Sequence, residues 1–489
     1  MEQSISADGR NQLRYEEVQG RLNRLIASGA YGPGTRLPSV RQLSGQMGVS
    51  ITTVLEAYRR LEDAGTVEAR PQSGYYVRER MTEFPRGQRL PAEPNIPQNL
   101  ESPSTVSVPD LVVRMLHDVK NPNLIPLGAA NPNTDLLPLK RLTRAMNEVV
   151  HRDPRLANSY DVVPGCEPLR VQIARRLVMA GCAVTPDEIM TTTGCQEAIH
   201  LALRVLCKPG DAVAVESPNY YGFLQAIESL DLRVLEIPTS PRDGISLDAL
   251  EYALDHNKVS ACLVVTNFSN PLGGTIPDDG KQRLVNLLAS RGVPLIEDDI
   301  YGELYFGDSR PRVCKSWDAD GNVLLCGSFS KTLAPGYRVG WVAGGRYQKE
   351  LVRLKLVTNL GSPMITQLTI AEYLQEGGFD HSLRRARKAY REQTMMMGKA
   401  VGHYFPEGTK ASRPAGGFVV WVELPANVDG RVVYERALEH GITIAPGAIF
   451  SAQDKYRNHI RLNAARWDAD IERAIERIGT IVADLGTAG

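Results

Sequence analysis

Near the N-terminus, apolar residues recur at helical spacing in three short segments, and a stretch of alternating residues follows them. The apolar positions of the three segments are Tyr15, Val18, Leu22, Leu25 and Ile26; Val40, Leu43 and Met47; and Val54, Ala57, Tyr58 and Leu61. The alternating stretch, residues 66–78, surrounds Pro71-Gln72-Ser73-Gly74, which predicts a two-stranded hairpin. Helix, helix, tight turn, helix and hairpin is the order of a winged helix-turn-helix, an α+β unit.

Capping residues and glycines set the ends of these predicted helices. Ser39 and Gln42 have the spacing of a capping box at the start of the second helix, and Gly48 ends it. Ser50 can cap the third helix, which Gly65 stops. We therefore place the first domain, the head, at residues 10–79.

From about residue 110 the pattern changes to short apolar runs separated by helix-length segments. The strand candidates are residues 188–193, 212–216, 233–237, 261–266, 293–298 and 322–326. This alternation predicts an α/β domain with a mostly parallel sheet over residues 110–489, with a smaller C-terminal α+β subdomain from about 385 to 489. Ligands of such sheets collect at the carboxyl ends of the strands.

Residues 80–109 separate the two predicted domains and hold few large apolar residues. The prolines of this stretch are Pro85, Pro91, Pro94, Pro97, Pro103 and Pro109. Such a composition predicts an extended, semi-stiff linker, which could let each head lie against a neighbouring subunit.

Length and composition exclude several classes of protein. A chain of 489 residues with 43% apolar residues is too long for one ordinary domain and can bury large cores. It has no apolar run long enough to span a membrane and no secretory signal, so no membrane partner is expected. The seven cysteines form no CxxC pair, which predicts a reducing cytoplasm and no metal site.

The net charge of zero argues for no particular partner, and the first 80 residues carry only a net charge of +2. The prediction of double-stranded DNA as a partner therefore rests on the winged-helix pattern. The third helix would enter the major groove, Arg41 would reach a phosphate or a base edge, and the wing tip, with Gln72, would touch the minor groove. The predicted DNA contacts are Ser39, Arg41, Ser50, Thr52, Thr53, Arg70 and Ser73.

The head resembles the GntR family of bacterial regulators. The likeness is carried by the runs 33–39 (PGTRLPS), 57–62 (AYRRLE) and 69–77 (ARPQSGYYV). Many members have an arginine that reads guanine just after the position of Ser50, where this chain has Ile51. The departure removes the family's base-recognition rule but not DNA binding. The alternative is a head used only for dimer or protein contact.

The octapeptide 327–334 (GSFSKTLA) carries the clearest chemistry. Lys331 follows Ser328 and Ser330, and Arg338 comes seven residues later. A lysine amine can condense with the aldehyde of pyridoxal 5'-phosphate (PLP), while hydroxyls and an arginine bind its phosphate. The run therefore predicts a PLP site.

Other chemical motifs follow predicted strands, and one more lies far downstream. The runs are 193–196 (TGCQ), which opens a helix whose amides can bind phosphate; 216–220 (ESPNY); 267–274 (NFSNPLGG); 297–301 (EDDIY); and 459–463 (HIRLN). In the fourth run either Asp298 or Asp299 can pair with the pyridine nitrogen. In the last run Arg461 can hold a substrate carboxylate with two hydrogen bonds, although a lone arginine in a strand is more often an ion-pair residue.

Over roughly residues 110–489, these motifs in this order resemble the fold-type I aminotransferases. The resemblance implies that Lys331 is the Schiff-base lysine and catalytic residue, and that Arg461 binds the substrate α-carboxylate. It implies a homodimer in which Tyr160 reaches the partner's phosphate. The cofactor-binding residues that it implies are Lys331, Asp298 (ring nitrogen), Asn270 and Tyr301 (phenolate), Tyr220 (stacking), and Gly194, Cys195, Gln196, Ser328, Ser330, Arg338 and Tyr160 (phosphate).

Together the two parts resemble the MocR subfamily of GntR regulators, in which a winged helix is fused to an aminotransferase-like domain. The resemblance implies a PLP-dependent transcriptional regulator that binds operator DNA and senses PLP, an amino acid or an amine through aldimine chemistry at Lys331. Two alternatives stay open. One is an active aminotransferase with a DNA-binding head, and the other is an aminotransferase whose head only oligomerises.

Overall fold

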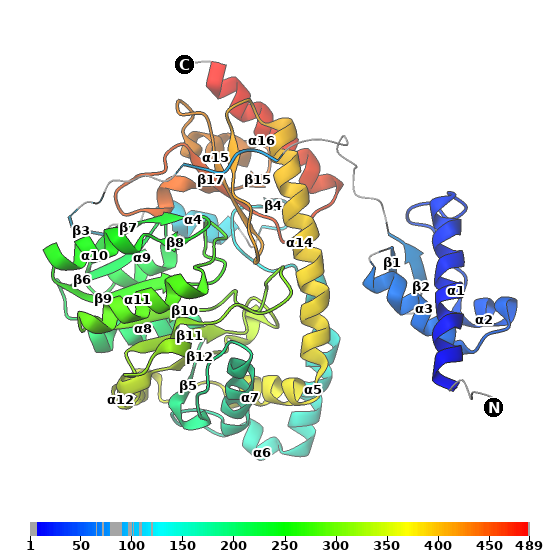
Figure 1. Ribbon diagram of the computed structural model, residues 1–489, viewed down its shortest axis with the longest axis horizontal. Helices are drawn as coiled ribbons and strands as arrows, with labels where there is room; N and C mark the ends of the chain where they lie inside the picture. Colours follow the sequence, from blue (N-terminus) through cyan, green and yellow to red (C-terminus); the bar gives the residue numbers. More distant parts are fainter. Residues whose placement is uncertain are drawn as a thin grey trace, which may run out of the picture. The chain divides into compact units, whose positions relative to one another are not determined.

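The computed structural model describes residues 7–64, 66–70, 73–78, 90–95, 100, 102–106, 110–118 and 121–487. It divides into two compact units, Met1–Arg86 and Gly87–Gly489 (Figure 1). We call the first unit the head and the second the body. Gly65, Pro71 and Gln72, and Pro85, Pro97 and Pro109 of the predicted linker, lie outside the described residues.

The head has the predicted order of elements. These are α1 (Ala7–Ala27), α2 (Val40–Met47), α3 (Ile51–Asp63), β1 (Val67–Arg70) and β2 (Gly74–Val77). The Ser39–Gln42 capping box begins α2, Gly48 ends it in the left-handed region at φ 63°, and the Ser50 side chain caps α3. The predicted helix boundaries of the head are therefore confirmed at these three residues.

Tyr58 fixes α3 within the head. Its buried ring stacks on Tyr75 of the hairpin with centroids 4.3 Å apart, and its hydroxyl donates to the Pro38 carbonyl oxygen at 2.6 Å. The residue thus ties the third helix to the hairpin and to the start of α2.

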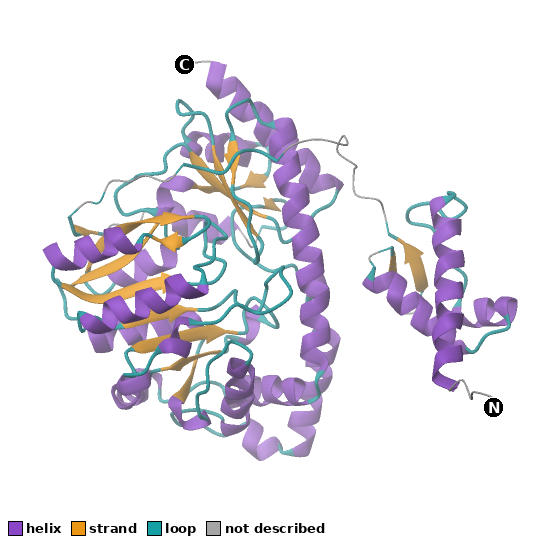
Figure 2. Cartoon of the chain, in the orientation of Figure 1, coloured by secondary structure: helices purple, strands orange, loops and turns teal. Residues whose placement is uncertain are grey.

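The body contains a nine-stranded sheet, in which six strands run in the same direction (Figures 1 and 2). Across the sheet the strands are β3 (Ser104–Thr105), β7 (Arg233–Ser240), β6 (Ala212–Ser217), β9 (Val259–Val265), β10 (Leu295–Asp298), β11 (Val323–Ser328), β12 (Gly340–Ala343) and β5 (Ile189–Thr192), and β8 (Gly244–Ile245) pairs with β7. β3, β8 and β12 are antiparallel to their neighbours and were not among the strand candidates. The mostly parallel sheet is confirmed.

Helices cover both faces of this sheet, because successive residues of the inner strands are buried on opposite sides. In β9, Leu263 and Val265 face the cluster that contains α8 and α9, whereas Cys262 and Val264 face the cluster that contains α10 and α11. The helices of this part of the body are α5 (Leu139–Arg152), α6 (Pro154–Ala157), α7 (Glu167–Val178), α8 (Cys195–Leu206), α9 (Tyr221–Glu228), α10 (Leu247–His256), α11 (Asp278–Ser290), α12 (Gln348–Asn359) and α13 (Met364–Gln375), whereas α4 (Asp110–Asp118) bonds through Asp118 to Tyr434 of the C-terminal part.

The C-terminal part forms a second, smaller sheet with helices, as expected for an α+β subdomain (Figure 2). Its elements are α14 (Gly378–Tyr404), β13 (Lys410–Ala411), β14 (Val419–Glu423), α15 (Gly430–Glu439), β15 (Ile442–Thr443), β16 (Ala445–Pro446), β17 (His459–Asn463) and α16 (Ala469–Thr487), and β4 (Ile125–Pro126) pairs with β15. β17 lies at the centre and carries Arg461.

The described residues of the predicted linker lie against the body. Within residues 90–95, backbone carbonyl oxygens accept from the Ala411 N–H at 2.8 Å and the Arg413 guanidinium at 3.0 Å. A glutamate of this segment accepts from Arg242 at 2.6 Å, and a backbone N–H donates to Glu423 at 2.6 Å. The segment is therefore a docked strap on the body rather than an unattached spacer.

Within the described ranges, no helix combines the length and the apolar character that crossing a membrane requires.

Candidate functional site

The strands of the large sheet bring the predicted chemical motifs to one edge. β5, β6, β9, β10 and β11 run in the same direction, so their carboxyl ends share that edge. The motif residues that follow these ends, from Gly194 to Arg338, are up to 144 positions apart in sequence. The sheet nevertheless places them on one side. This edge is the candidate site.

Gly194 and Arg338 form one end of the site, at the N-terminus of α8. Gly194 has φ 89° and precedes α8, and a Cβ atom there would collide with the Arg338 guanidinium. Arg338 donates to the Ser330 hydroxyl at 3.3 Å, and the Ser328 and Ser330 hydroxyls are 2.8 Å apart. A guanidinium, two hydroxyls and a helix N-terminus together form an anion-binding cradle.

The three consecutive acids at the end of β10 have different partners. Glu297 accepts from Thr266 at 2.6 Å, away from the cradle. Asp299 accepts from Arg310 at 2.5 Å in a buried ion pair. Asp298 accepts from the Cys195 thiol at 3.2 Å and from the Ile300 N–H at 3.0 Å, and burial raises the pKa of Asp298 to about 7. Asp298, and not Asp299, is therefore the carboxylate beside the first residue of α8.

The buried Asp299–Arg310 pair predicts that Asp299 contributes much more to the stability of the body than an acid of an exposed ion pair does. We expect Asp299→Asn to lower the free energy of unfolding of the body by about 3 kcal/mol, because it leaves a buried guanidinium short of its counter-charge. Glu303, 3.8 Å from Arg310, keeps the loss at the lower end of the usual range. Urea denaturation would measure it. Asp470→Asn, which breaks an exposed pair with Arg473, is the control and should cost less than about 1 kcal/mol; equal losses would contradict the prediction.

Lys331 lies between the anion cradle and Arg461. Its amine donates to the Ala130 carbonyl oxygen at 2.8 Å and lies 6.0 Å from the centroid of the Tyr301 ring. Burial, and then the positive charge of Arg461, lowers the pKa of Lys331 to about 8. A lysine with a lowered pKa is a nucleophile near neutral pH.

Arg461 forms the other end of the site and is completely buried. Its guanidinium donates to the Asn270 side-chain oxygen at 3.2 Å and to the Gly128 carbonyl oxygen, and its Nε has no protein partner. The guanidinium carbon lies 5.5 Å from the centroid of the Phe450 ring. Burial lowers the pKa of Arg461, so the site holds an incompletely satisfied cation.

Arg338 and Arg461 both lack a carboxylate partner, which indicates the kind of ligand that the site accepts. Their hydrogen bonds go to hydroxyl, amide and carbonyl oxygens. In the part of the chain that the structure describes, neither Arg338 nor Arg461 forms an ion pair with a carboxylate. Arg461 is completely buried, so its charge favours a counter-charge from a ligand, whereas Arg338 is exposed to solvent and leaves its guanidinium accessible to an anion in the cradle. The site therefore suits a molecule, or a pair of molecules, with one anionic group at each end.

The remaining predicted residues lie around the site whose two ends are Arg338 and Arg461. Asn270 follows β9, Tyr301 is buried against Phe418, and Tyr220 caps α9 and packs edge-on to Phe223. The Gln196 side chain donates to the Gly222 carbonyl oxygen at 2.8 Å, and the buried thiol of Cys195 has a raised pKa, so it is not a reactive thiolate. Tyr160 stands apart from the others and is 85% exposed.

The segment 128–131 belongs to the site, and sequence reasoning missed it. Its carbonyl oxygens accept from Lys331 and Arg461, and Asn463 holds two more of them at 2.7 and 3.0 Å. A Cβ at Gly128 would collide with the Ile444 backbone, so only glycine fits there. The small residues of this run (Gly-Ala-Ala-Asn) were the one available signal.

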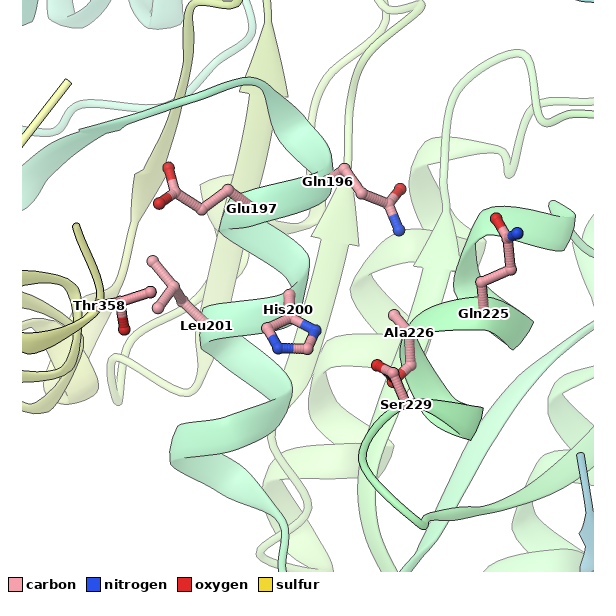
Figure 3. A pocket seen from close by; sticks show the side chains of 8 residues that line it. All are labelled: Gln196, Glu197, His200, Leu201, Gln225, Ala226, Ser229 and Thr358. Atoms are coloured by element: carbon pink, nitrogen blue, oxygen red, sulfur yellow. Dashed lines mark hydrogen bonds between the residues drawn. The ribbon is translucent and has the colours of Figure 1, made fainter. Parts of the chain in front are cut away.

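A pocket of about 300 Å³ opens beside the anion cradle (Figure 3). Figure 3 shows Gln196 and His200 of α8 projecting toward the side of the pocket that α9 forms. The lining residues are Gln196, Glu197, His200, Leu201, Gln225, Ala226, Ser229 and Thr358. Gln196 thus connects this surface pocket to the N-terminal turn of α8.

In the head, the predicted DNA-contact residues differ in their exposure and in whether their side chains already have a partner. Ser39, Arg41, Ser50, Thr52 and Arg70 are exposed. Arg70 is also paired with Glu68 at 2.7 Å, and the half-buried Ser73 bonds to Tyr76 at 2.6 Å.

The prediction for Thr53 needs correction. Its side chain is buried, and its hydroxyl lies 2.7 Å from the Ser50 hydroxyl within the helix cap. Thr53 therefore stabilises the start of α3 and is not presented to DNA.

Two family profiles match the chain, and they divide it as the structure does. The family described as "Aminotransferase class I and II" matches residues 122–478. The family described as "Bacterial regulatory proteins, gntR family" matches residues 14–77. The first covers most of the body and the second covers the head.

Individual proteins resemble either the whole chain or the body alone. The HTH-type transcriptional regulator YjiR of Escherichia coli (strain K12) is 39% identical over 96% of this chain and 98% of its own. The 2-aminoadipate transaminase of Thermus thermophilus is 33% identical over 76% of this chain and 93% of its own. The structure of LysN, the α-aminoadipate aminotransferase of Thermus thermophilus, complexed with N-(5'-phosphopyridoxyl)-L-leucine, has a TM-score of 0.72 at 31% identity, over 77% of this chain and 96% of that one.

Proposed function

The chain belongs to the MocR subfamily of gntR-type transcriptional regulators, in which a winged helix is joined to a class I and II aminotransferase domain, and we propose that it binds PLP and senses a small amino compound or PLP itself. One observation carries the proposal. Two arginines without carboxylate partners, Arg338 and Arg461, lie on either side of a lysine whose pKa is lowered to about 8. A phosphate and a carboxylate are the anions that such a pair fits.

The residues present match the parts of the cofactor. Ser328, Ser330, Arg338 and the N-terminus of α8 would bind its phosphate, and Asp298 would pair with its ring nitrogen. Since the Asn270 oxygen accepts from Arg461, its amide nitrogen would donate to the phenolate oxygen. Bound there, PLP would supply an aldehyde that condenses with amines and a ring that withdraws electrons.

Two side chains of the site hold protons that this chemistry needs. The amine of Lys331 keeps its proton only below a pKa of about 8, and Ala130 orients it through one hydrogen bond. Asp298 has its own pKa raised to about 7 by burial, so a cationic ring nitrogen opposite it would stabilise the ionised carboxylate. Arg461 would hold the α-carboxylate of an amino acid in a fixed orientation.

The lowered pKa of Lys331 predicts how cofactor capture depends on pH. Only the neutral amine attacks an aldehyde, and about a tenth of it is neutral at pH 7, against about one part in three thousand at the ordinary pKa of 10.5. We expect the rate constant for covalent capture of PLP by the apoprotein to rise about tenfold per unit below pH 7.5 and to level above about 8.5. Stopped-flow absorbance would measure it; a rate that still rises steeply at pH 10 would contradict the lowered pKa.

We further propose that a second copy of the chain completes the site. Tyr160 is almost fully exposed, Val162 is 55% exposed, and Leu356, Val357 and Leu360 add exposed apolar surface at the end of α12. We propose that this surface forms a homodimer in which Tyr160 of one protomer reaches the phosphate end of the other site. The pocket beside Gln196 supports this arrangement, because it opens next to that end.

Mixed dimers test the exchange of Tyr160. Lys331→Ala removes the lysine of a protomer's own site, and Tyr160→Ala removes the contribution to the partner's site. Co-expression of differently tagged copies should give heterodimers with one intact site, which retain PLP covalently, after borohydride treatment, at about half the wild-type stoichiometry and bind it at that site with wild-type affinity. Tyr160→Ala homodimers should bind PLP about tenfold more weakly, as for one lost hydrogen bond to a charged group. Wild-type affinity in those homodimers would exclude the exchange.

A second candidate function is transamination. The complete set of site residues and the likeness to a named transaminase favour it. An absorbance titration of the PLP-bound protein with amino acids and amines separates the candidates. Conversion of the cofactor to its amine form would demonstrate an aminotransferase and identify its donor. A spectral shift without conversion would indicate a sensor and name the effector, and no response to any compound would leave PLP itself as the signal.

A further inference from the structure

The outward face of α3 carries two large apolar side chains. Ile51 is 48% exposed and Leu55 is 43% exposed, whereas Val54, Tyr58 and the other apolar residues of α3 are buried in the core of the head. Ile51 and Leu55 are four residues apart, so they lie one above the other on the same side of the helix. Arg59, another four residues on, is exposed and continues this line.

The polar side chains beside these two residues are occupied within the helix. The Ser50 hydroxyl accepts from the Thr53 N–H at 3.1 Å and lies 2.7 Å from the Thr52 hydroxyl. One turn further, Glu56 accepts from Arg60 at 3.2 Å. The first turn of α3 contains no arginine, lysine, asparagine or glutamine, the side chains that form paired hydrogen bonds with purine edges.

We propose that Ile51 and Leu55 are specificity-determining residues, which select thymine through its C5-methyl group in the major groove. This inference rests on the DNA-binding role of the head. The thymine methyl is the apolar feature of the major groove, so it is the complement of an exposed apolar stripe at the start of a recognition helix. The exposed guanidinium of Arg59, at the other end of the stripe, would contact the phosphate backbone. The head thus reads A·T pairs where an arginine in the first turn would read guanine.

Deoxyuridine provides the direct test, because it differs from thymidine only by the missing methyl group. Duplexes would first be selected from a random pool by the full-length, PLP-loaded protein. Each thymine of a selected duplex would then be replaced singly by deoxyuridine, and the dissociation constants would be measured by fluorescence anisotropy. Removal of a contacted methyl should weaken binding about fourfold at one or two positions in each half-site. Ile51→Ala and Leu55→Ala should each abolish the effect at one of these positions.

Arg41→Ala is the matched control in the head. It should weaken binding to the thymine and deoxyuridine duplexes equally and reduce the salt dependence by about one counterion. Equal affinity for every thymine and deoxyuridine pair, or an unchanged methyl effect in both alanine variants, would overturn the inference while leaving DNA binding intact. A protein that enriches no duplex from the pool would instead contradict the DNA-binding role itself, and the inference with it.

Discussion

Lys331→Ala is expected to eliminate covalent retention of PLP completely. In wild-type protein, sodium borohydride should fix one cofactor per chain to Lys331, because its amine lies in the site and its pKa is lowered to about 8. The variant keeps Arg338, Ser330 and Asp298, so it should still bind PLP without a covalent bond, through the phosphate and the ring nitrogen. Intact-protein mass spectrometry after borohydride treatment, together with the visible absorbance, would measure the loss.

An exposed lysine provides the control for this experiment. Lys349→Ala, on α12 and outside the site, should retain the wild-type adduct. A borohydride-stable adduct of equal yield in Lys331→Ala would refute the assignment. Lys281, Lys315 and Lys355 are buried elsewhere in the body, and peptide mapping of any residual adduct would reveal whether one of them reacts instead.

Arg461→Ala is expected to weaken the response to amino acids by about 100- to 1,000-fold. A guanidinium that holds a carboxylate with two charge-assisted hydrogen bonds contributes about 3–4 kcal/mol, and Arg461 is buried with one nitrogen unsatisfied. PLP affinity should change little, because the phosphate cradle at Arg338 lies at the other end of the site. The amino-acid concentration that gives half of the spectral change would measure the response, and amines without a carboxylate should be unaffected.

The design separates a binding role from a structural one. Arg457→Ala removes an exposed arginine of the same region, paired with Asp454, and should leave both affinities unchanged. Arg461→Lys keeps a charge but cannot donate two parallel hydrogen bonds, so it should recover only part of the amino-acid response. Parallel loss of PLP binding and amino-acid response in Arg461→Ala, together with a lower melting temperature, would mean that the arginine supports the fold instead.

The fold was largely predictable because its elements carry local signals. All six strand candidates contain strands, since inner strands of a parallel sheet read as short apolar runs. The short strands β3, β8 and β12 of the large sheet were missed because a few residues of ordinary composition acquire strand structure only by pairing with β7, β11 and β5. In the head, the capping box at Ser39 and the turn at Gly48 were readable because such caps use local hydrogen bonds.

The candidate site was predictable only in its residue types. Asp298 and Asp299 are adjacent and chemically identical, and the distant Arg310 decides between them by pairing with Asp299. The segment 128–131 contributes backbone carbonyl oxygens. Every residue has such an oxygen, so no side chain in the sequence indicated that this segment belongs to the site. Thr53 was predicted at the DNA surface because its position was judged without knowing which side of α3 is buried.

The sequence by itself determined the two-domain plan, the alternation of strands and helices, and the lysine, serines and arginines that make a PLP site the best prediction. These features depend on the spacing and type of residues that are close together in the sequence. Only the tertiary structure decided which charges face each other. It also decided that residues 90–95 dock on the loops at Arg242 and Arg413. These two loops lie close to Gly273 and Gly274, beside Asn270. Such contacts join residues hundreds of positions apart, and their energies depend on burial that no local pattern specifies.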